Sequence, residues 1–179
     1  MISVEEARER ILANFQRLPV ERKPLLAALG QVLAADVVSP YDLPPLANTG
    51  MDGYALRAAD TAGASEAAPV RLRVITNLAA GYVSDVPIGP GEAARIMTGA
   101  PIPPGADAVV PFEETDEVLR GPNEQPRPGG EVAIFKAAKH GANVRERGGD
   151  VRAGNRVIEA GRVLRASEIG VLSSLGLTE

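Results

Sequence analysis

The chain contains no cysteine and only one histidine, His140, among its 179 residues. Without cysteine it can form no disulfide framework, no thiolate nucleophile and no thiolate metal site, and one histidine excludes a multi-histidine metal cluster. These absences remove cysteine hydrolases and serine–histidine hydrolases from the functions to be considered.

Aromatic residues are also scarce, at 3% of the chain with no tryptophan, so the cores must be built from Ala, Val, Leu and Ile. Glycine and proline are abundant instead, with 19 and 15 residues. This composition is typical of many turns and short strands and argues against an all-helical protein.

The chain has no excess of basic residues: 23 acidic and 19 basic side chains give a net charge of −4, and only the short run from Arg145 to Arg152 is rich in arginine. We therefore expect no nucleic-acid partner. No apolar run approaches the roughly 18 residues of a membrane span, and the N-terminus lacks a signal-peptide pattern. We expect no membrane association and a soluble cytoplasmic protein.

Helical patterns occur at both ends of the chain. The segment Ser3-Val4-Glu5-Glu6 has the spacing of a capping box and begins a surface helix predicted over residues 4 to 17. A last helix is predicted from a Ser167 cap to Leu175. A short helix is also expected to begin at Pro24. Its inward-facing residues are expected to be Leu25, Leu26 and Leu29.

Strand patterns fill the middle of the chain. Val70, Leu72 and Val74 alternate with arginines, which is the period of a half-buried strand. Short strands separated by glycine and proline predict a small β-barrel-like or sandwich domain, and an α+β, β-rich fold class. The other expected segments are strands at 53–57, 93–97, 106–111 and 132–135, an exposed loop at 117–130, and a strand pair within 151–164.

Three rigid loops carry the side chains best suited to chemistry. Asp52 lies in a loop of prolines, glycines and Asn48, and Thr98 precedes Gly99. The segment from Arg145 to Asp150 holds two arginines and ends in the carboxylate of Asp150. Carboxylates can hold a divalent cation, and threonine and arginine can contact phosphate oxygens. Together the loops suit a phosphorylated substrate with a metal.

The same residues also have a purely structural interpretation. Asp52 can bond the backbone of its own Asp-Gly turn, and Thr98 can bond within its own loop. Arg147 and Asp150 can form a surface ion pair worth about 0–1 kcal/mol. The residues alone leave both interpretations open.

The three loops resemble, in order, the N-terminal half of the molybdopterin molybdenumtransferases, a family to which the E domain of gephyrin belongs. The resemblance is carried by Met51-Asp52-Gly53-Tyr54-Ala55, by Met97-Thr98-Gly99-Ala100-Pro101, and by Gly141, Asn143-Val144-Arg145, Gly148 and Asp150. It covers nearly the whole chain, and the combination of the first two motifs is highly specific.

The resemblance implies an enzyme that inserts molybdate into molybdopterin while adenylylated molybdopterin is hydrolysed, with a divalent metal such as Mg²⁺. It implies a homodimer, with molybdopterin adenylyltransferase as a further partner. Carried over by position, the implied catalytic residues are Asp52, Thr98 and Asp150, with Asp52 also the metal ligand. The implied substrate-binding residues are Met51, Gly53, Gly99 and Arg147.

The resemblance also implies a division into an N-terminal helix (1–17), a linking and dimerisation domain (18–41 and 139–179) and an inserted β-rich domain (42–138). Members of the family continue into an α/β domain that binds molybdopterin. We therefore expect a fragment that lacks the main substrate pocket and is inactive by itself, with its first helix frayed.

Two other functions stay open at this point. One is a non-catalytic scaffolding or partner-binding module of the gephyrin type, and the other is a small β-rich nucleotide-binding domain. A gene that continues past Glu179 into a molybdopterin-binding domain would favour the enzyme.

Overall fold

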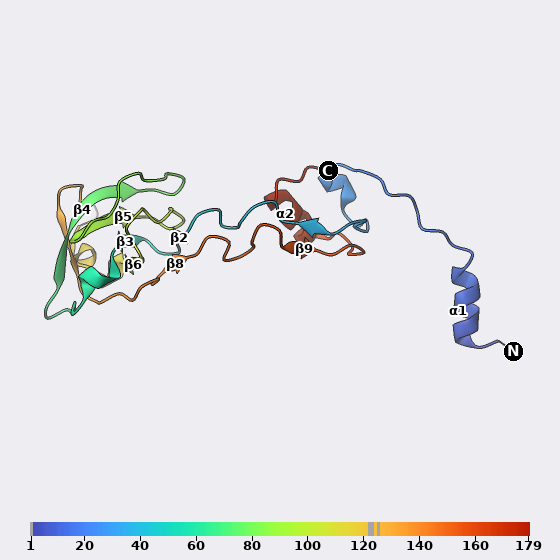
Figure 1. Cartoon of the computed structure of the whole chain (residues 1–179), viewed down its shortest axis with the longest axis horizontal. Coiled ribbons are helices and arrows are strands. Elements are labelled where there is room, and N and C mark those ends of the chain that lie inside the picture. Colours follow the sequence, from blue (N-terminus) through green and yellow to red (C-terminus); the bar gives the residue numbers. More distant parts are fainter. Residues whose placement is uncertain (1, 122–123, 125) are drawn as a thin grey trace. The chain divides into compact units, whose positions relative to one another are not determined.

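The computed structural model describes residues 2–121, 124 and 126–179. It consists of two compact units (Figure 1). The central unit is Ser39–Asn155, and the terminal unit combines Met1–Val38 with Arg156–Glu179. The predicted α+β, β-rich fold class is confirmed by the strands and short helices of the two units.

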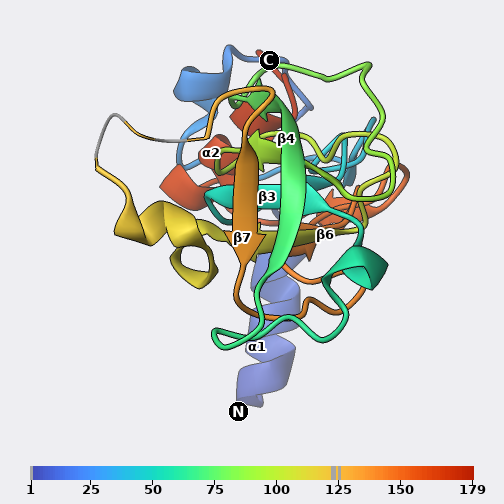
Figure 2. The same ribbon diagram turned by 90° about the vertical axis from the view of Figure 1, so that its left-hand side faces the viewer.

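The central unit is built around a mixed five-stranded sheet with the strand order β6-β3-β5-β4-β7. Only β4 and β5 run parallel, and the other neighbours are antiparallel. Figure 2 shows β4 and β7 side by side on the face of this unit. The strands are β3 (Gly53–Leu56), β4 (Val70–Leu78), β5 (Glu92–Ile96), β6 (Ala108–Pro111) and β7 (Glu131–Ile134).

Burial follows the sequence pattern that predicted these strands. In β4, Leu72 and Val74 are buried while Arg71 and Arg73 point to solvent, as the alternation requires. Strand β3, which lies between β6 and β5, is buried throughout, because side chains pack on both of its faces. All four residues of β3 therefore lie in the interior of the unit.

Short 3-10 helices connect the strands of the central unit. They are η2 (Ala58–Thr61), η3 (Phe112–Glu114) and η4 (Asp116–Leu119). The prediction of an exposed loop over 117–130 is wrong at its start, because Glu117 is buried inside η4. The Pro122-Asn123 part of that loop lies outside the described residues.

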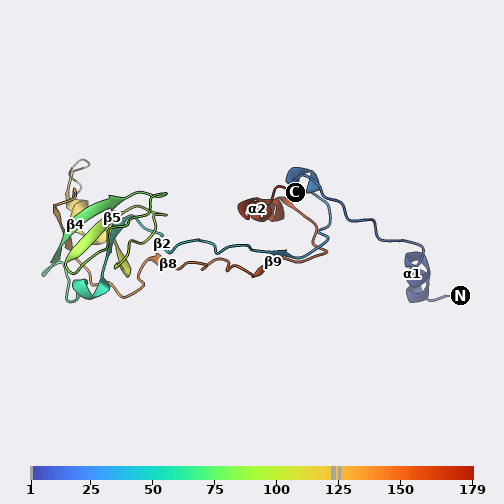
Figure 3. The same ribbon diagram turned by 45° about the horizontal axis from the view of Figure 1, so that its top comes forward.

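Two short antiparallel pairs involve the segments that flank the sheet in sequence. β2 (Asn48–Thr49) pairs with β8 (Val144–Arg145), and β1 (Val37–Val38) pairs with β9 (Arg156–Ile158). Figure 3 shows β2 beside β8. The prediction that residues 151–164 pair with each other is wrong: their partners lie in the segment 32–43, more than 100 residues away and invisible to a local pattern.

The terminal unit has a small core between β9 and α2 (Ala166–Ser174), made of Ile158, Leu164, Ile169 and Leu172. The short 3-10 helix η1 (Leu25–Ala28) packs Leu25 against this core. The expected inward positions of Leu26 and Leu29 are wrong, since they are 81% and 56% exposed. A single 3-10 turn has only one face to bury.

The two α-helices differ from their predicted limits. α1 is Val4–Leu12, capped by Ser3, and none of its residues is buried; it ends before residue 17 because no packing extends it. α2 begins one residue before the expected Ser167 cap, and Glu168 accepts a hydrogen bond from the N–H of Arg165 at 3.0 Å. No helix in the described ranges is long and apolar enough to cross a bilayer.

The compact units do not coincide with the domain division implied by the resemblance. Residues 139–155 lie in the same unit as the sheet. The division into a helix (1–17), a linking domain and an inserted domain (42–138) remains a prediction about the family.

Candidate functional site

Asp52 and Thr98 are brought together by the pairing of β3 with β5. Gly53 opposes Ile96 in this antiparallel pair, so the residue before β3 and the loop after β5 emerge at the same end of the sheet. The N–H of Thr98 donates to Oδ1 of Asp52 at 2.7 Å, and the Thr98 hydroxyl donates to the same oxygen at 2.7 Å. Thr98 thus bonds a second loop, and not merely its own turn.

These bonds determine the charge state of Asp52. The backbone N–H of Thr98, then its hydroxyl, and at longer range the charge of Arg95 lower the pKa of Asp52 below its ordinary value, while partial burial acts in the opposite direction. Asp52 is therefore a carboxylate at neutral pH. Among the described contacts none involves its Oδ2, which leaves that oxygen for a ligand.

The loops on either side of this pair are held by a buried threonine. The Thr49 hydroxyl accepts from Met51 N–H and donates to the Met51 carbonyl, both at 3.0 Å. The Thr49 carbonyl accepts from Gly99 N–H at 2.8 Å, so one residue ties the Asp52 loop to the Thr98 loop. Met51 is 46% exposed and Gly99 is also exposed, both open to a ligand.

Glycine is required at two positions of the predicted site. A Cβ on Gly53 would lie 2.1 Å from the carbonyl oxygen of Val110 on the neighbouring strand β6. Gly99 has a φ of 83°, in the left-handed region that side chains disfavour. Gly53 is buried, so its role in the structure is to let β3 and β6 approach closely.

The third loop has different partners. Arg147 donates to Asp42 at 2.6 Å, and Arg145 donates to Asp150 at 2.7 Å. The ion pair considered from the sequence, between Arg147 and Asp150, therefore does not form, because each residue has another partner. No described contact joins Arg147 or Asp150 to Asp52 or Thr98.

The Arg145–Asp150 pair nevertheless runs alongside the Asp52 loop. Arg145 opposes Asn48 in the β2–β8 pair, and a Cβ on Gly50 would lie 4.0 Å from the Arg145 side chain. The structure thus unites Asp52 with Thr98 directly, whereas Asp150 is paired with an arginine that lies beside Asn48 and Gly50.

Sequence reasoning missed a buried ionic cluster under this site. Arg95 of β5 is 5% exposed and Glu117 of η4 is 7% exposed, and the guanidinium binds the carboxylate through two bonds of 2.8 Å. The Tyr54 hydroxyl donates to the same carboxylate, and burial, followed by Glu117, raises the pKa of Tyr54 well above its usual value. The available signal was an arginine inside the apolar run Ala93-Ala94-Arg95-Ile96.

A metal site complete in itself does not occur in the described part of the chain, where no group of three or more acidic or histidine side chains could hold an ion. The free Oδ2 of Asp52 fits one position in the coordination shell of Mg²⁺, which commonly takes one or two carboxylates and leaves the remainder to water and substrate phosphates. Asp52 therefore fits a metal ion whose other ligands come from water and the substrate.

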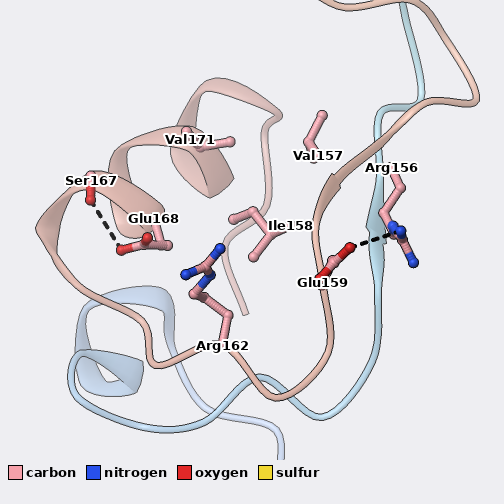
Figure 4. A pocket seen from close by; sticks show the side chains of 8 residues that line it. All are labelled: Arg156, Val157, Ile158, Glu159, Arg162, Ser167, Glu168 and Val171. Atoms are coloured by element: carbon pink, nitrogen blue, oxygen red, sulfur yellow. Dashed lines mark hydrogen bonds and ion pairs between the residues drawn. The ribbon is translucent and has the colours of Figure 1, made fainter.

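A cavity of about 400 Å³ lies in the terminal unit, between β9 and α2. Figure 4 shows Arg162 and Glu168 on one side of it, and Arg156 paired with Glu159 on the other. It contains none of the predicted site residues.

Comparison with known proteins identifies the family of this chain. The family model described as "MoeA N-terminal region (domain I and II)" matches residues 2–176. Molybdopterin molybdenumtransferase 2 of Mycobacterium tuberculosis is 42% identical over 181 residues, which cover 100% of this chain and 42% of that protein. Molybdopterin molybdenumtransferase of Staphylococcus aureus is 36% identical over 99% of this chain and 40% of its own length.

Solved structures show the same relationship. Two crystal structures of the molybdopterin biosynthesis MoeA protein from Pyrococcus horikoshii match with TM-scores of 0.80 and 0.85 at 37% and 34% identity. They cover 99% and 97% of this chain, which spans 43% and 44% of theirs. The chain thus corresponds to about two fifths of the length of its relatives, and it belongs to the MoeA N-terminal family.

Proposed function

We propose that this chain is the N-terminal part of a molybdopterin molybdenumtransferase, which inserts molybdate into molybdopterin with hydrolysis of adenylylated molybdopterin. The family match and the names of the relatives support the reaction. The observation that carries the site is the double hydrogen bond from Thr98 to one oxygen of Asp52. The chain contributes this pair as one wall of a site completed by other domains, and by itself it is inactive.

The geometry gives each residue of the pair a defined role. The hydroxyl proton of Thr98 is committed to Asp52, so the lone pairs of Thr98 Oγ1 face a ligand as acceptors. Asp52, fixed through Oδ1, directs Oδ2 at a phosphate-bound water or a cation. Because carboxylate and hydroxyl repel an unscreened phosphate, the substrate's own phosphate must arrive with a cation or a protonated oxygen.

Mg²⁺ is the cation proposed for this position. Asp52 holds it with one oxygen, and when bound it neutralises phosphate charge during hydrolysis. Asp150, paired with Arg145, supports the wall beside the Asp52 loop. Arg147 offers phosphate its terminal nitrogens, because only its Nε contacts Asp42 and its side chain is 67% exposed.

The remaining parts of the proposal concern the setting of the complete protein. It is a cytoplasmic homodimer, and it receives adenylylated molybdopterin from a molybdopterin adenylyltransferase. The exposed Met51 and Gly99 backbone line the entry to the Asp52–Thr98 wall.

The test is turnover by the complete protein, supplied with adenylylated molybdopterin, molybdate and Mg²⁺, with AMP release as the readout. The complete protein should turn over, the 179-residue chain should not, and Asp52→Ala in the complete protein should lower the rate by about a hundredfold. Glu66→Ala, a surface change outside the site, is the matched control. Full turnover by Asp52→Ala would contradict the site, and no turnover by the unmodified protein would favour the scaffolding alternative.

A further inference from the structure

The buried cluster of Arg95, Glu117 and Tyr54 lies directly behind the Asp52–Thr98 pair in the sheet. Arg95 and Tyr54 oppose each other in β5 and β3, one residue further from the site than Gly53 and Ile96. The guanidinium also stacks near two rings, with its carbon 5.5 Å from the Tyr54 centroid and 5.8 Å from the Phe112 centroid. Its plane is therefore held on several sides.

The part of Arg95 that does not contact Glu117 reaches the backbone of the site. Its Nη1 donates to the Ile96 carbonyl at 2.9 Å and to the Gly53 carbonyl at 3.3 Å. It also lies 3.5 Å from the sulfur of Met97. Gly53 follows Asp52 directly, and Met97 precedes Thr98 directly, so one nitrogen contacts the chain on both sides of the pair.

Stability alone does not explain such a cluster. Removing two charges from water costs several kcal/mol per ion, and a well-packed apolar replacement is often as stable. A buried ion pair can instead impose one geometry on its surroundings, because each donor and acceptor must be met. Here the geometry imposed is the distance between two strand ends.

We propose that Arg95 is a positioning residue for the Asp52–Thr98 pair: its Nη1 group fixes the strand ends that carry the two residues, and Glu117 and Tyr54 orient the guanidinium. The role rests on the proposed function only where turnover is concerned. The link between Arg95 and the Asp52–Thr98 hydrogen bonds belongs to this chain and can be measured without substrate.

The test uses Arg95→Lys, which keeps the charge and loses the planar fork that reaches the carboxylate and both carbonyls at once. Val132→Ala is the control for general loss of stability, because Val132 is fully buried in β7, two strands from β5. In the complete protein, hydrogen exchange followed by mass spectrometry with fragmentation reports on the Thr98 amide. Arg95→Lys should speed the exchange of the Thr98 amide about tenfold or more. Val132→Ala should speed the exchange of this amide no more than that of the other amides in the sheet.

Turnover supplies the second arm. Arg95→Lys should lower kcat about tenfold with little change in KM, because a displaced pair slows the reaction more than it weakens binding. In an Asp52→Asn background the same substitution should cost little more, since the residue through which Arg95 acts has already been changed.

The outcomes separate this proposal from the proposed function. An unchanged Thr98 exchange rate in Arg95→Lys, or an equal loss of kcat in both backgrounds, would overturn the positioning role. A complete protein without any turnover would overturn the proposed function, and the exchange of the Thr98 amide would still decide the role of Arg95.

Discussion

Thr98 donates both its backbone N–H and its hydroxyl to a single oxygen of Asp52, across 46 residues of sequence. Two donors on one oxygen fix the rotamers of both side chains and hold Asp52 ionised. The arrangement also links two loops that carry the most specific motifs of the family.

The first prediction concerns the pH dependence of stability. The folded-state pKa of Asp52 is lowered, so its contribution to stability is present above its ordinary pKa of 3.8 and is lost as pH falls through the lower folded value. The melting temperature of the chain should therefore fall more steeply below about pH 4 than that of Asp52→Asn. Parallel curves for the two proteins between pH 2.5 and 6 would contradict the charge-stabilising role of Thr98.

The second prediction concerns Gly53. A Cβ placed 2.1 Å from the Val110 carbonyl oxygen cannot be relieved by a side-chain movement, because the obstacle is backbone. Gly53→Ala should lower the free energy of unfolding by about 3 kcal/mol or more. Gly50→Ala, three residues earlier in the chain, is the matched control, since the nearest neighbour of its Cβ would lie 4.0 Å away, and it should change stability by less than about 0.5 kcal/mol. Urea unfolding that ranks the two variants equally would count against the close approach of β3 and β6.

The third prediction concerns α1. It has 9 residues and none is buried, whereas isolated helices below about 12–15 residues are marginal in water. In the 179-residue chain its amides should exchange almost as fast as unstructured peptide, although Ser3 accepts a capping bond from Glu6 N–H at 3.1 Å. If the amides of α1 were as well protected from hydrogen exchange as those of β3, this prediction would be wrong.

The fourth prediction separates Arg147 from its partner Asp42. The arginine is mostly exposed, while Asp42 also accepts a hydrogen bond from Ala153 N–H at 2.9 Å. Arg147→Ala should leave the melting temperature nearly unchanged and raise KM for adenylylated molybdopterin in the complete protein. Asp42→Ala should instead lower the melting temperature. If Arg147→Ala changed only stability, its substrate-binding role would be wrong.

The sheet could be predicted from the sequence wherever the pattern is local. Val70, Leu72 and Val74 alternate with arginines, and β4 lies there, because one face of that strand is covered and the other is solvated. The pairing of residues 37–38 with 156–158 could not be predicted, since the local pattern of residues 151–164 does not indicate which distant segment pairs with them.

The candidate site divides in the same way. Local chemistry selected Asp52 and Thr98 as residues of two loops that together suit a phosphorylated substrate, and the family resemblance supported that grouping. Neither could predict the hydrogen bonds between them, which depend on the pairing of β3 with β5. Glu117 was missed because its polar surroundings are typical of an exposed loop, and its burial depends on Arg95, 22 residues earlier. A charged residue in an apolar strand predicts that it has an oppositely charged partner, but it does not indicate which residue that partner is.

The most direct test of the account is a double-mutant cycle of Asp52→Asn and Thr98→Val in the complete protein, scored by hydrolysis of adenylylated molybdopterin. If the two residues act as one unit, each single variant should lose about tenfold or more, and the double variant should lose little beyond the worse single variant. Thr98→Ser, which keeps the hydroxyl, should retain most of the rate. Unmodified turnover in both single variants would contradict the site, and fully additive losses would contradict the claim that Thr98 acts through Asp52.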